Sequence, residues 1–183
     1  MDRDGTISRK LAPGVYLESW EAFEFCPDTV VAMQDLARDG FSFVVITNQS
    51  GIARGLVKAS EVDRIHRKMT TELAALGITI LETYVSPDSP DSPSTTRKPA
   101  PGLFHQASRE HGFCLGEVLY VGDEVRDCEV ASAAGCGMVL LAKSACDRNI
   151  PENDRHLSVH ESMTDALDDI RSYYRRSSGS PWS

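Results

Sequence analysis

Extended runs of Lys and Arg are missing from this sequence, and so are the long apolar segments that mark a membrane protein. The net charge is −8, which argues against a nucleic-acid surface because phosphate backbones are bound by clustered basic residues. No stretch approaches the ~20 apolar residues that cross a bilayer, and no basic segment followed by an apolar one opens the chain. We therefore expect a cytoplasmic protein with neither a nucleic-acid nor a membrane partner.

Paired cysteines are missing as well. The five cysteines are scattered along the chain and never stand two residues apart, at positions Cys26, Cys114, Cys128, Cys136 and Cys146. This pattern favours neither a disulfide framework nor a zinc ribbon. We expect these side chains to be small core residues or free thiols.

The composition that remains is typical of an ordinary globular domain. The chain has 183 residues, of which 41% are hydrophobic and 25% charged, enough for one domain with a sizeable core. We expect one monomeric domain over residues 1–176, followed by a flexible tail over residues 177–183.

Amphipathic segments alternate with short, nearly continuous apolar runs. Helices are predicted from residue 27, with Asp28 as a cap, from residue 60, after residue 101, over 127–134 and over 163–174. Strands are predicted over 41–46, 78–85, 118–121 and 138–142. This alternation predicts a three-layer α/β fold with a parallel sheet.

Polar side chains follow the predicted strands. In α/β folds the ligand lies beyond the carboxyl ends of the strands, and the residues found there are Asp2, Asp4, Thr47, Asn48, Arg97, Lys98 and Asp123. Carboxylates, hydroxyl and amide groups, and a pair of cations are therefore expected at one edge of the sheet.

These residue types suit the hydrolysis of a phosphate monoester. A carboxylate can attack phosphorus and form an aspartyl-phosphate, while a second carboxylate exchanges protons with the leaving group and water. Mg²⁺ relieves the repulsion between the anions and prefers oxygen ligands, for which Asp2, Asp4 and Asp123 are candidates. Lys98 would supply positive charge to the phosphoryl oxygens and Thr47 a hydrogen bond.

Four motifs resemble those of the haloacid dehalogenase superfamily of phosphatases. They are Asp2-Arg3-Asp4-Gly5-Thr6, Thr47 after its strand, Lys98, and Gly122-Asp123 with Asp127. More narrowly, residues 47–55 and 97–102 resemble the D-glycero-D-manno-heptose 1,7-bisphosphate 7-phosphatases, with the histidinol-phosphate phosphatases as a related group.

The resemblance implies a Rossmann-like parallel sheet with a minimal cap or none, and a role for each matching residue. Asp2 would be the nucleophile and a Mg²⁺ ligand, and Asp4 the general acid/base that also lends its main-chain carbonyl to the metal. Thr47 and Lys98 would stabilise the phosphoryl group, and Asp123 would bind the metal. The residues expected to bind the substrate, a phosphorylated sugar and most specifically a heptose bisphosphate, are Arg3, Asn48, Gln49, Ser50, Arg54 and Arg97.

The sequence departs from these relatives in the loop before Arg97. Many of the heptose phosphatases hold zinc there with Cys and His, whereas residues 86–89 and 94–96 of this chain contain neither. Zinc is therefore not expected, and the loop should be more mobile. Asp127 has two interpretations, a carboxylate at a helix N-terminus or a partner of the metal site.

The first, central strand of such a sheet is missing, because no apolar run precedes Asp2. Five buried apolar residues would contribute on the order of 10 kcal/mol, comparable to the about 5 to 15 kcal/mol of a whole domain. We expect the chain as it stands to be poorly stable or rearranged, and its start to be misassigned or shortened.

Other functions fit the same residues. Histidinol phosphate and a polynucleotide 3′-phosphate are alternative substrates, although the acidic charge counts against the second. A different kind of alternative is a non-catalytic relative that binds a phosphate ligand or a partner. Such a protein would leave Asp2 badly placed for attack.

Overall fold

Five strands carry the fold of the residues that the computed structural model describes, 1–142 and 155–177. Every pairing among them is parallel, with β1 beside β2 and β3, β4 and β5 side by side. The strands are β1 (Phe43–Asn48), β2 (Ile80–Ser86), β3 (Leu119–Gly122), β4 (Gly137–Leu141) and β5 (Leu157–His160). The helices between them are α1 (Pro27–Arg38), α2 (Ala59–Ala75), α3 (Gly102–His111), α4 (Val125–Ala134) and α5 (Leu167–Ser177), with short 3-10 turns at Trp20–Ala22 and Leu115–Glu117.

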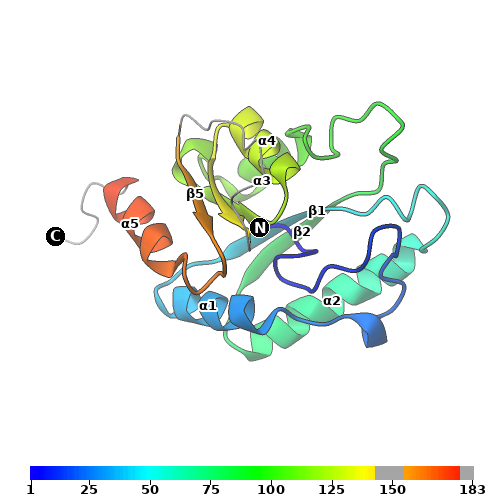
Figure 1. The fold of residues 1–183 in the computed structure, drawn as a ribbon, viewed down its shortest axis with the longest axis horizontal. Coiled ribbons are helices and arrows are strands. Elements are labelled where there is room, and N and C mark those ends of the chain that lie inside the picture. The colour runs from blue at the N-terminus through cyan, green and yellow to red at the C-terminus, as the bar shows by residue number, and fades with distance from the viewer. Residues whose placement is uncertain (143–154, 178–183) are drawn as a thin grey trace.

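Helices cover both faces of these strands, as Figure 1 shows with α1 and α2 below and α3 and α4 above. Alternate side chains of β1 enter opposite cores, because successive strand residues point to opposite faces. Val45 packs in the core formed with α1, α2 and α5, and Ile46 in the core formed with α3 and α4. The predicted three-layer parallel α/β fold is confirmed.

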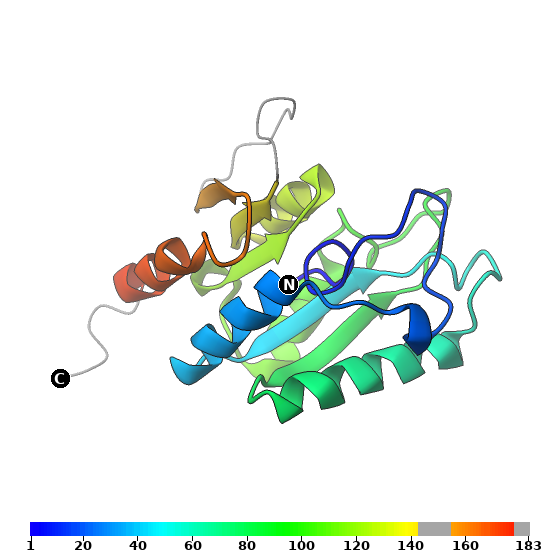
Figure 2. The ribbon, with the colours of Figure 1, turned by 60° about the horizontal axis from the view of Figure 1, so that its bottom comes forward.

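The sheet is divided between β1 and β3, where the N-terminus lies (Figures 1 and 2). Only two residues bridge the halves with main-chain hydrogen bonds in the part of the chain described. The Met1 nitrogen donates to the Val44 oxygen at 2.6 Å, and the Ile46 nitrogen donates to the Met1 oxygen at 2.9 Å. On the other side the Asp2 nitrogen donates to the Val121 oxygen at 2.8 Å. Asp2 is thereby fixed at the carboxyl edge of both halves.

A mostly apolar cavity of about 460 Å³ accompanies this division of the sheet. It is lined from both halves of the sheet and from the helices α1, α3 and α5, by residues that include Leu36, Phe43, Val44, Phe104, Val121 and Ile170. The cavity lies where the sequence predicts a missing central strand. The strands on either side keep their parallel pairing, and the predicted low stability stays a prediction.

Several element boundaries differ from the predictions. The strand β5 was not predicted, because its four residues are only half-buried and give no apolar run. The last helix begins at Leu167 instead of residue 163, since the preceding residues form a turn whose Met163 and Thr164 amides donate to Asp28. Asp28 therefore caps this turn, and no side-chain cap bonds the start of α1.

Two further predictions concern the ends and connections of the chain. The helix α5 continues to Ser177, and the rest of the predicted tail lies outside the described residues. The β1–α2 and β2–α3 connections are loops, so no added domain stands over the site in the part of the chain described. No helix among these residues is long and apolar enough to span a membrane.

The divided sheet leads to a stability prediction. An extension of about five apolar, β-branched residues in front of Met1 should enter the cavity and raise the midpoint of thermal unfolding of chain 1–183. Each side chain that becomes buried contributes about 1.5 to 3 kcal/mol, and each kcal/mol shifts the midpoint by about 2 to 4 °C in a chain of this size. A Gly-Ser extension of equal length is the control, and equal midpoints for the two extended chains would contradict the prediction.

Candidate active site

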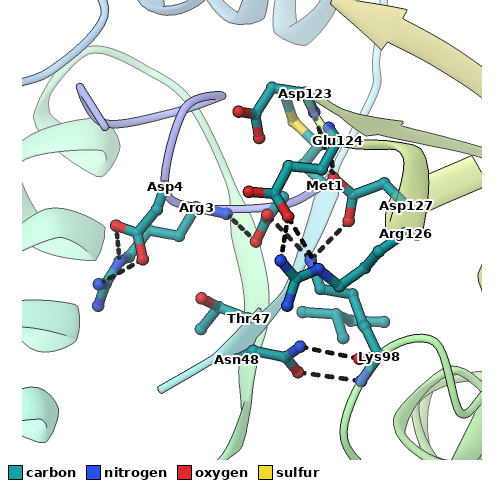
Figure 3. A network of polar contacts seen from close by, with 12 residues as sticks. Met1, Arg3, Asp4, Thr47, Asn48, Lys98, Asp123, Glu124, Arg126 and Asp127 are labelled. Atoms are coloured by element: carbon teal, nitrogen blue, oxygen red, sulfur yellow. Dashed lines mark hydrogen bonds and ion pairs between the residues drawn. The ribbon is translucent and has the colours of Figure 1, made fainter. Parts of the chain in front are cut away.

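Lys98 joins the first and fourth motifs in the interior of the protein. Its ammonium nitrogen lies 2.9 Å from Asp2 Oδ2 and 2.8 Å from Asp127 Oδ1 (Figure 3). The same nitrogen donates to the hydroxyl of Tyr120 at 2.8 Å, and the residue is only 3% exposed. A charge this deeply buried needs partners of this kind, so the arrangement fixes both carboxylates relative to the lysine.

Asn48 fixes the main chain on which Lys98 is carried. Its side-chain amide donates to the Lys98 oxygen at 3.1 Å and accepts from the Lys98 nitrogen at 3.0 Å (Figure 3). Because Asn48 is the last residue of β1, these bonds tie the loop after β2 to the end of the neighbouring strand. This is a positioning role; the predicted contact of Asn48 with substrate stays a prediction.

Three carboxylates form a group that suits a hard cation. One oxygen each of Asp2, Asp123 and Asp127 lie within 4.8 Å of one another, and carboxylate oxygens are the donors that Mg²⁺ prefers. Their three negative charges face two ammonium groups, since Lys10 contacts Asp123 at 2.6 Å and Lys98 the other two. The donor set therefore fits a divalent cation, and it adds Asp127 to the predicted Asp2 and Asp123, while the predicted main-chain carbonyl of Asp4 stays a prediction.

Gly5 allows this group to form. Its φ is +86°, a conformation that favours glycine, and a Cβ atom there would lie 2.3 Å from Asp123 Oδ2. Asp127 in turn accepts from the main-chain nitrogens of Asp123 and Glu124 at 3.2 and 3.1 Å. Asp127 thus shows both predicted features, because it lies in the first turn of α4 and belongs to the carboxylate group.

Burial and charge shift the acidities of the two central groups. Burial raises the pKa of Asp2 to about 7, although the Lys98 ammonium acts in the opposite direction. Burial alone would lower the pKa of Lys98, but the carboxylates of Asp2 and Asp127 raise it above its usual value. Removal of water from carboxylates raises their pKa, so a cation at this site would help to keep Asp2 ionised.

Asp4 is held at the side of the site by Arg3 and Gln49. Arg3 donates from Nε and Nη2 to the two carboxylate oxygens of Asp4 at 2.9 and 2.8 Å (Figure 3), and Gln49 donates to Asp4 Oδ2 at 2.9 Å. The same Gln49 nitrogen donates to the hydroxyl of Thr47 at 2.8 Å. This geometry links the predicted acid/base to the end of β1.

Arg3 lies in the interior, only 1% exposed, and its remaining contact is with His66. Its Nη1 lies 2.8 Å from His66 Nε2, and because arginine is always a donor, that ring nitrogen accepts. His66 is therefore neutral, and burial, followed by the charge of Arg3, lowers its pKa to about 3. These contacts suit a residue that positions Asp4, while the predicted contact of Arg3 with substrate stays a prediction.

A cavity of about 260 Å³ opens over these residues and meets a wider groove of about 1130 Å³. Asp2, Asp4, Thr47, Asn48, Gln49, Ser50, Arg97 and Lys98 line the cavity. Arg97 also lines the groove, whereas Arg54 is exposed near enough to Arg97 to help lower its pKa. The predicted catalytic residues are therefore brought together beside open space.

The loop that precedes Lys98 is organised by Asp88. Its Oδ2 accepts hydrogen bonds from the hydroxyls of Ser94 and Thr96 at 2.5 and 2.9 Å, and Ser94 Oγ accepts from the Arg97 nitrogen at 2.8 Å. Arg97 Nη1 donates to the main-chain oxygen of Asp88 at 3.1 Å. The carboxylate of Asp88 and the hydroxyls of Ser94 and Thr96 thus connect the two ends of the loop over residues 88–97. This is the loop for which zinc was not expected.

Sequence patterns did not identify several residues of the site. Lys10 comes from a loop with no periodic pattern, and Tyr120 and His66 sit inside a strand and a helix, where each fits the core pattern equally well. Glu124 and Arg126 lie in a mostly charged run of residues, 123–127, which is equally typical of an exposed loop. A polar residue at a core position, such as Tyr120 between Leu119 and Val121, is the one signal that was available.

The fold and the site together define a phosphatase of the haloacid dehalogenase class. Four groups meet at one sheet edge: the acidic residues of the N-terminal motif, the Thr47 hydroxyl at the end of β1, the buried Lys98, and a further acidic pair after β3. Residues 1–157 match the model of the family described as polynucleotide kinase 3 phosphatase, and the chain belongs to this family and to that superfamily of phosphatases.

Heptose phosphatases are among its relatives. The chain is 31% identical over 160 residues to D-glycero-beta-D-manno-heptose-1,7-bisphosphate 7-phosphatase of Bordetella bronchiseptica, covering 85% of this chain and 88% of that one. It is 36% identical over 147 residues to the corresponding alpha-heptose enzyme of Mycobacterium bovis, covering 77% of each. The crystal structure of the B. bronchiseptica phosphatase with magnesium and phosphate superposes with a TM-score of 0.82, at 30% identity, covering 93% of this chain and 96% of that one.

The neutral His66 predicts a pH-dependent loss of stability. Between about pH 6.5 and about pH 3 the unfolded chain binds a proton at this residue that the folded chain does not bind, so stability falls as the pH falls. Relative to His66→Gln, the wild type should lose up to about 1.4 kcal/mol per pH unit in this window. Urea unfolding at pH 7.5, 6 and 5 measures the difference.

The matched control is His105→Gln, which removes an exposed histidine of α3. If His66→Gln loses this dependence of the free energy of unfolding on pH and His105→Gln keeps it, the neutral, buried ring of His66 is supported. The same slope in wild type and His66→Gln would contradict it.

The hydrogen bonds of Asp88 predict an effect on loop order. Asp88→Ala removes the acceptor for Ser94 and Thr96, and each such bond contributes about 0.5 to 1.5 kcal/mol. Amide hydrogen exchange of residues 88–97 should therefore accelerate by about tenfold. Asp91→Ala, at the exposed tip of the same loop, is the control, and equal exchange in the two variants would contradict the assignment.

Proposed function

We propose that the chain is a Mg²⁺-dependent phosphatase that hydrolyses a phosphorylated sugar, most specifically a heptose 1,7-bisphosphate at its 7-phosphate. The observation that carries the proposal is Lys98 held between Asp2 and Asp127, with Asp123 close to both carboxylates. Similarity to the heptose phosphatases over most of the chain supports the substrate. Those relatives include enzymes for both the alpha and the beta heptose.

In the first half of the reaction, Asp2 attacks phosphorus. A bond forms between an Asp2 oxygen and phosphorus while the bond from phosphorus to the sugar oxygen breaks, and Asp4 gives its proton to the departing alkoxide. As the transition state forms, the Lys98 ammonium offsets the negative charge of the phosphoryl oxygens, and the Thr47 hydroxyl donates a hydrogen bond to them. Arg3 and Gln49 hold the Asp4 carboxylate at the side of the cavity.

In the second half, water restores the enzyme. Asp4 takes a proton from a water molecule, the water oxygen attacks phosphorus, and inorganic phosphate leaves as the Asp2 carboxylate is regenerated. Asp2, Asp123 and Asp127, with the main-chain carbonyl of Asp4, are the groups that would hold Mg²⁺. The cation would reduce the repulsion between the Asp2 carboxylate and the phosphate.

A polynucleotide 3′-phosphate is the second candidate substrate, favoured by the description of the matching family. The net charge of −8 disfavours it, because a polynucleotide carries negative charge far beyond the reacting phosphate. Histidinol phosphate fits the open cavity less specifically. A phosphate-release screen over the heptose bisphosphate, histidinol phosphate and a 3′-phosphorylated oligonucleotide separates the three.

The proposed mechanism predicts the effect of removing the nucleophile. Asp2→Asn should reduce Mg²⁺-dependent release of phosphate from an aryl phosphate by at least about 10³-fold, as is typical when a nucleophile is removed. Asparagine still accepts a hydrogen bond from Lys98, so the fold should persist, and circular dichroism checks this. Asp35→Asn, an exposed change on α1, is the control.

Two results would contradict this mechanism. One is turnover by the wild type that continues undiminished after all divalent cations are removed with EDTA. The other is an Asp2→Asn variant that keeps its activity, which would favour a non-catalytic role for the group around Lys98.

A further inference from the structure

Tyr120 places a hydroxyl group at the point where the two halves of the sheet meet the buried lysine. The residue lies on β3 and is only 3% exposed. Its hydroxyl accepts a hydrogen bond from the Lys98 ammonium at 2.8 Å and donates one to the main-chain oxygen of Ile46, on β1, at 3.0 Å. One oxygen atom therefore connects β3, β1 and the loop after β2.

The directions of these two hydrogen bonds follow from the chemistry of the partners. An ammonium can only donate and a main-chain carbonyl can only accept, so the hydroxyl accepts from Lys98 and donates to Ile46. Burial, followed by the charges of Asp2 and Asp127, raises the pKa of Tyr120 well above its usual value, so the hydroxyl keeps the proton that it donates. It cannot turn away without leaving a buried polar group unpaired, which is costly.

Each of the three hydrogens of the Lys98 ammonium has an acceptor. Asp2 Oδ2 lies at 2.9 Å, Asp127 Oδ1 at 2.8 Å and the Tyr120 hydroxyl at 2.8 Å, and an ammonium group has three donors. Two of these acceptors are carboxylates, and the third is neutral. Tyr120 therefore fixes the rotation of the ammonium without contributing to the compensation of its charge.

The neutral acceptor becomes important when the charge of Asp2 changes. In the proposed reaction the Asp2 carboxylate becomes an acyl phosphate, whose carboxyl oxygens carry less charge and accept hydrogen bonds more weakly. The hydrogen that pointed at Asp2 Oδ2 then becomes available to a phosphoryl oxygen. Asp127 and Tyr120 keep the ammonium in place while this hydrogen changes its acceptor.

We propose that Tyr120 is a positioning residue of the reaction, whose hydroxyl aims the Lys98 ammonium at the transferring phosphoryl group through a hydrogen bond that persists while Asp2 is phosphorylated. This role rests on the proposed function. Tyr120 lies outside the four motifs, in a strand where an apolar side chain would fill the same space. It lines neither the cavity over Asp2 nor the neighbouring groove, so it acts through Lys98 and not by touching the substrate.

The first test removes the hydroxyl and keeps the ring. Tyr120→Phe retains the T-shaped contact with Phe104, whose ring centroid lies 4.7 Å away. With an aryl phosphate at saturating Mg²⁺, kcat should fall about ten- to hundredfold, the loss expected for a hydrogen bond to a charged group. KM should change less than about twofold, because an interaction that matters in the transition state lowers kcat and kcat/KM together.

The matched control is Tyr173→Phe. The hydroxyl of Tyr173 also donates to a main-chain oxygen, that of Gly116 at 3.1 Å. Gly116 precedes the start of β3, whereas the site lies beyond the end of this strand. Tyr173→Phe should therefore keep the kcat of the wild type.

Inhibition by vanadate separates positioning from a loss of folded protein. Vanadate adopts the five-coordinate geometry of phosphoryl transfer, and analogues of a transition state bind through the interactions that stabilise it. A positioning role predicts that the Ki for vanadate rises about tenfold in Tyr120→Phe, in parallel with the fall in kcat. A partly folded variant would lose kcat while its folded molecules kept the wild-type Ki, so that result would overturn the role.

A measurement on the wild type covers the case in which Tyr120→Phe does not fold. The ammonium of Lys98 should give an NMR signal in isotope-labelled protein whose hydrogens exchange slowly with water, because all three are buried and bonded. Lys98→Met identifies this signal by its loss. Hydrogens that exchange as fast as those of the exposed Lys58 would overturn the proposal.

The outcomes distinguish this role from the proposed function. A folded Tyr120→Phe with the kcat and vanadate Ki of the wild type overturns the positioning role and leaves the phosphatase intact. A wild type that releases phosphate from no phosphomonoester overturns the proposed function. In that case calorimetric titration of vanadate into wild type and Tyr120→Phe still decides the role of Tyr120, and equal or absent binding counts against it.

Discussion

The buried ammonium of Lys98, shared by Asp2 and Asp127, is the interaction on which the rest of this structure depends. Burying charges costs several kcal/mol for each ion, and the cost is offset only when partners and hydrogen bonds are well placed. Here the compensation comes from three separate segments: the N-terminal motif through Asp2, the strand β3 through Tyr120, and the start of α4 through Asp127. Asn48, at the end of β1, holds the main chain of Lys98. A fold that satisfies this lysine therefore also assembles the carboxylates that the chemistry needs.

Sequence reasoning predicted the residues that end strands, and it missed those that support them. Thr47 and Asp123 follow apolar runs and Lys98 follows the loop after such a run, and parallel strands bring their carboxyl ends to one edge. Tyr120 and His66 occupy core positions, so periodicity could not show that they bond Lys98 and Arg3. The strand β5 and the contacts of Asp28 depend on tertiary neighbours that no local pattern contains. The two-residue bridge between β1 and β3 was not predicted.

The distribution of charge shapes what the site can select. The chain as a whole is acidic, yet Lys10, Arg97, Lys98 and Arg126 line the open space beside Asp2. A generally negative surface repels long polyanions, while these four cations, which lie among the carboxylates of the site, can still bind a compact anion. Side chains on loops can therefore distinguish a small anion from a long one, and a cap domain over the site is not needed for this.

The position of the Asp2 carboxylate depends on how the two halves of the sheet are held together. Asp2 bonds through its main chain to β3, and Met1 bonds to β1, so the position of Asp2 depends on the separation of the two halves. Lys98 reaches Asp2 from the loop after β2, and Asp127 reaches Lys98 from beyond β3. A change in the width of the gap would therefore alter these ion-pair distances directly. Packing in the apolar cavity therefore affects the distances between Asp2, Lys98 and Asp127, although these three residues do not line that cavity.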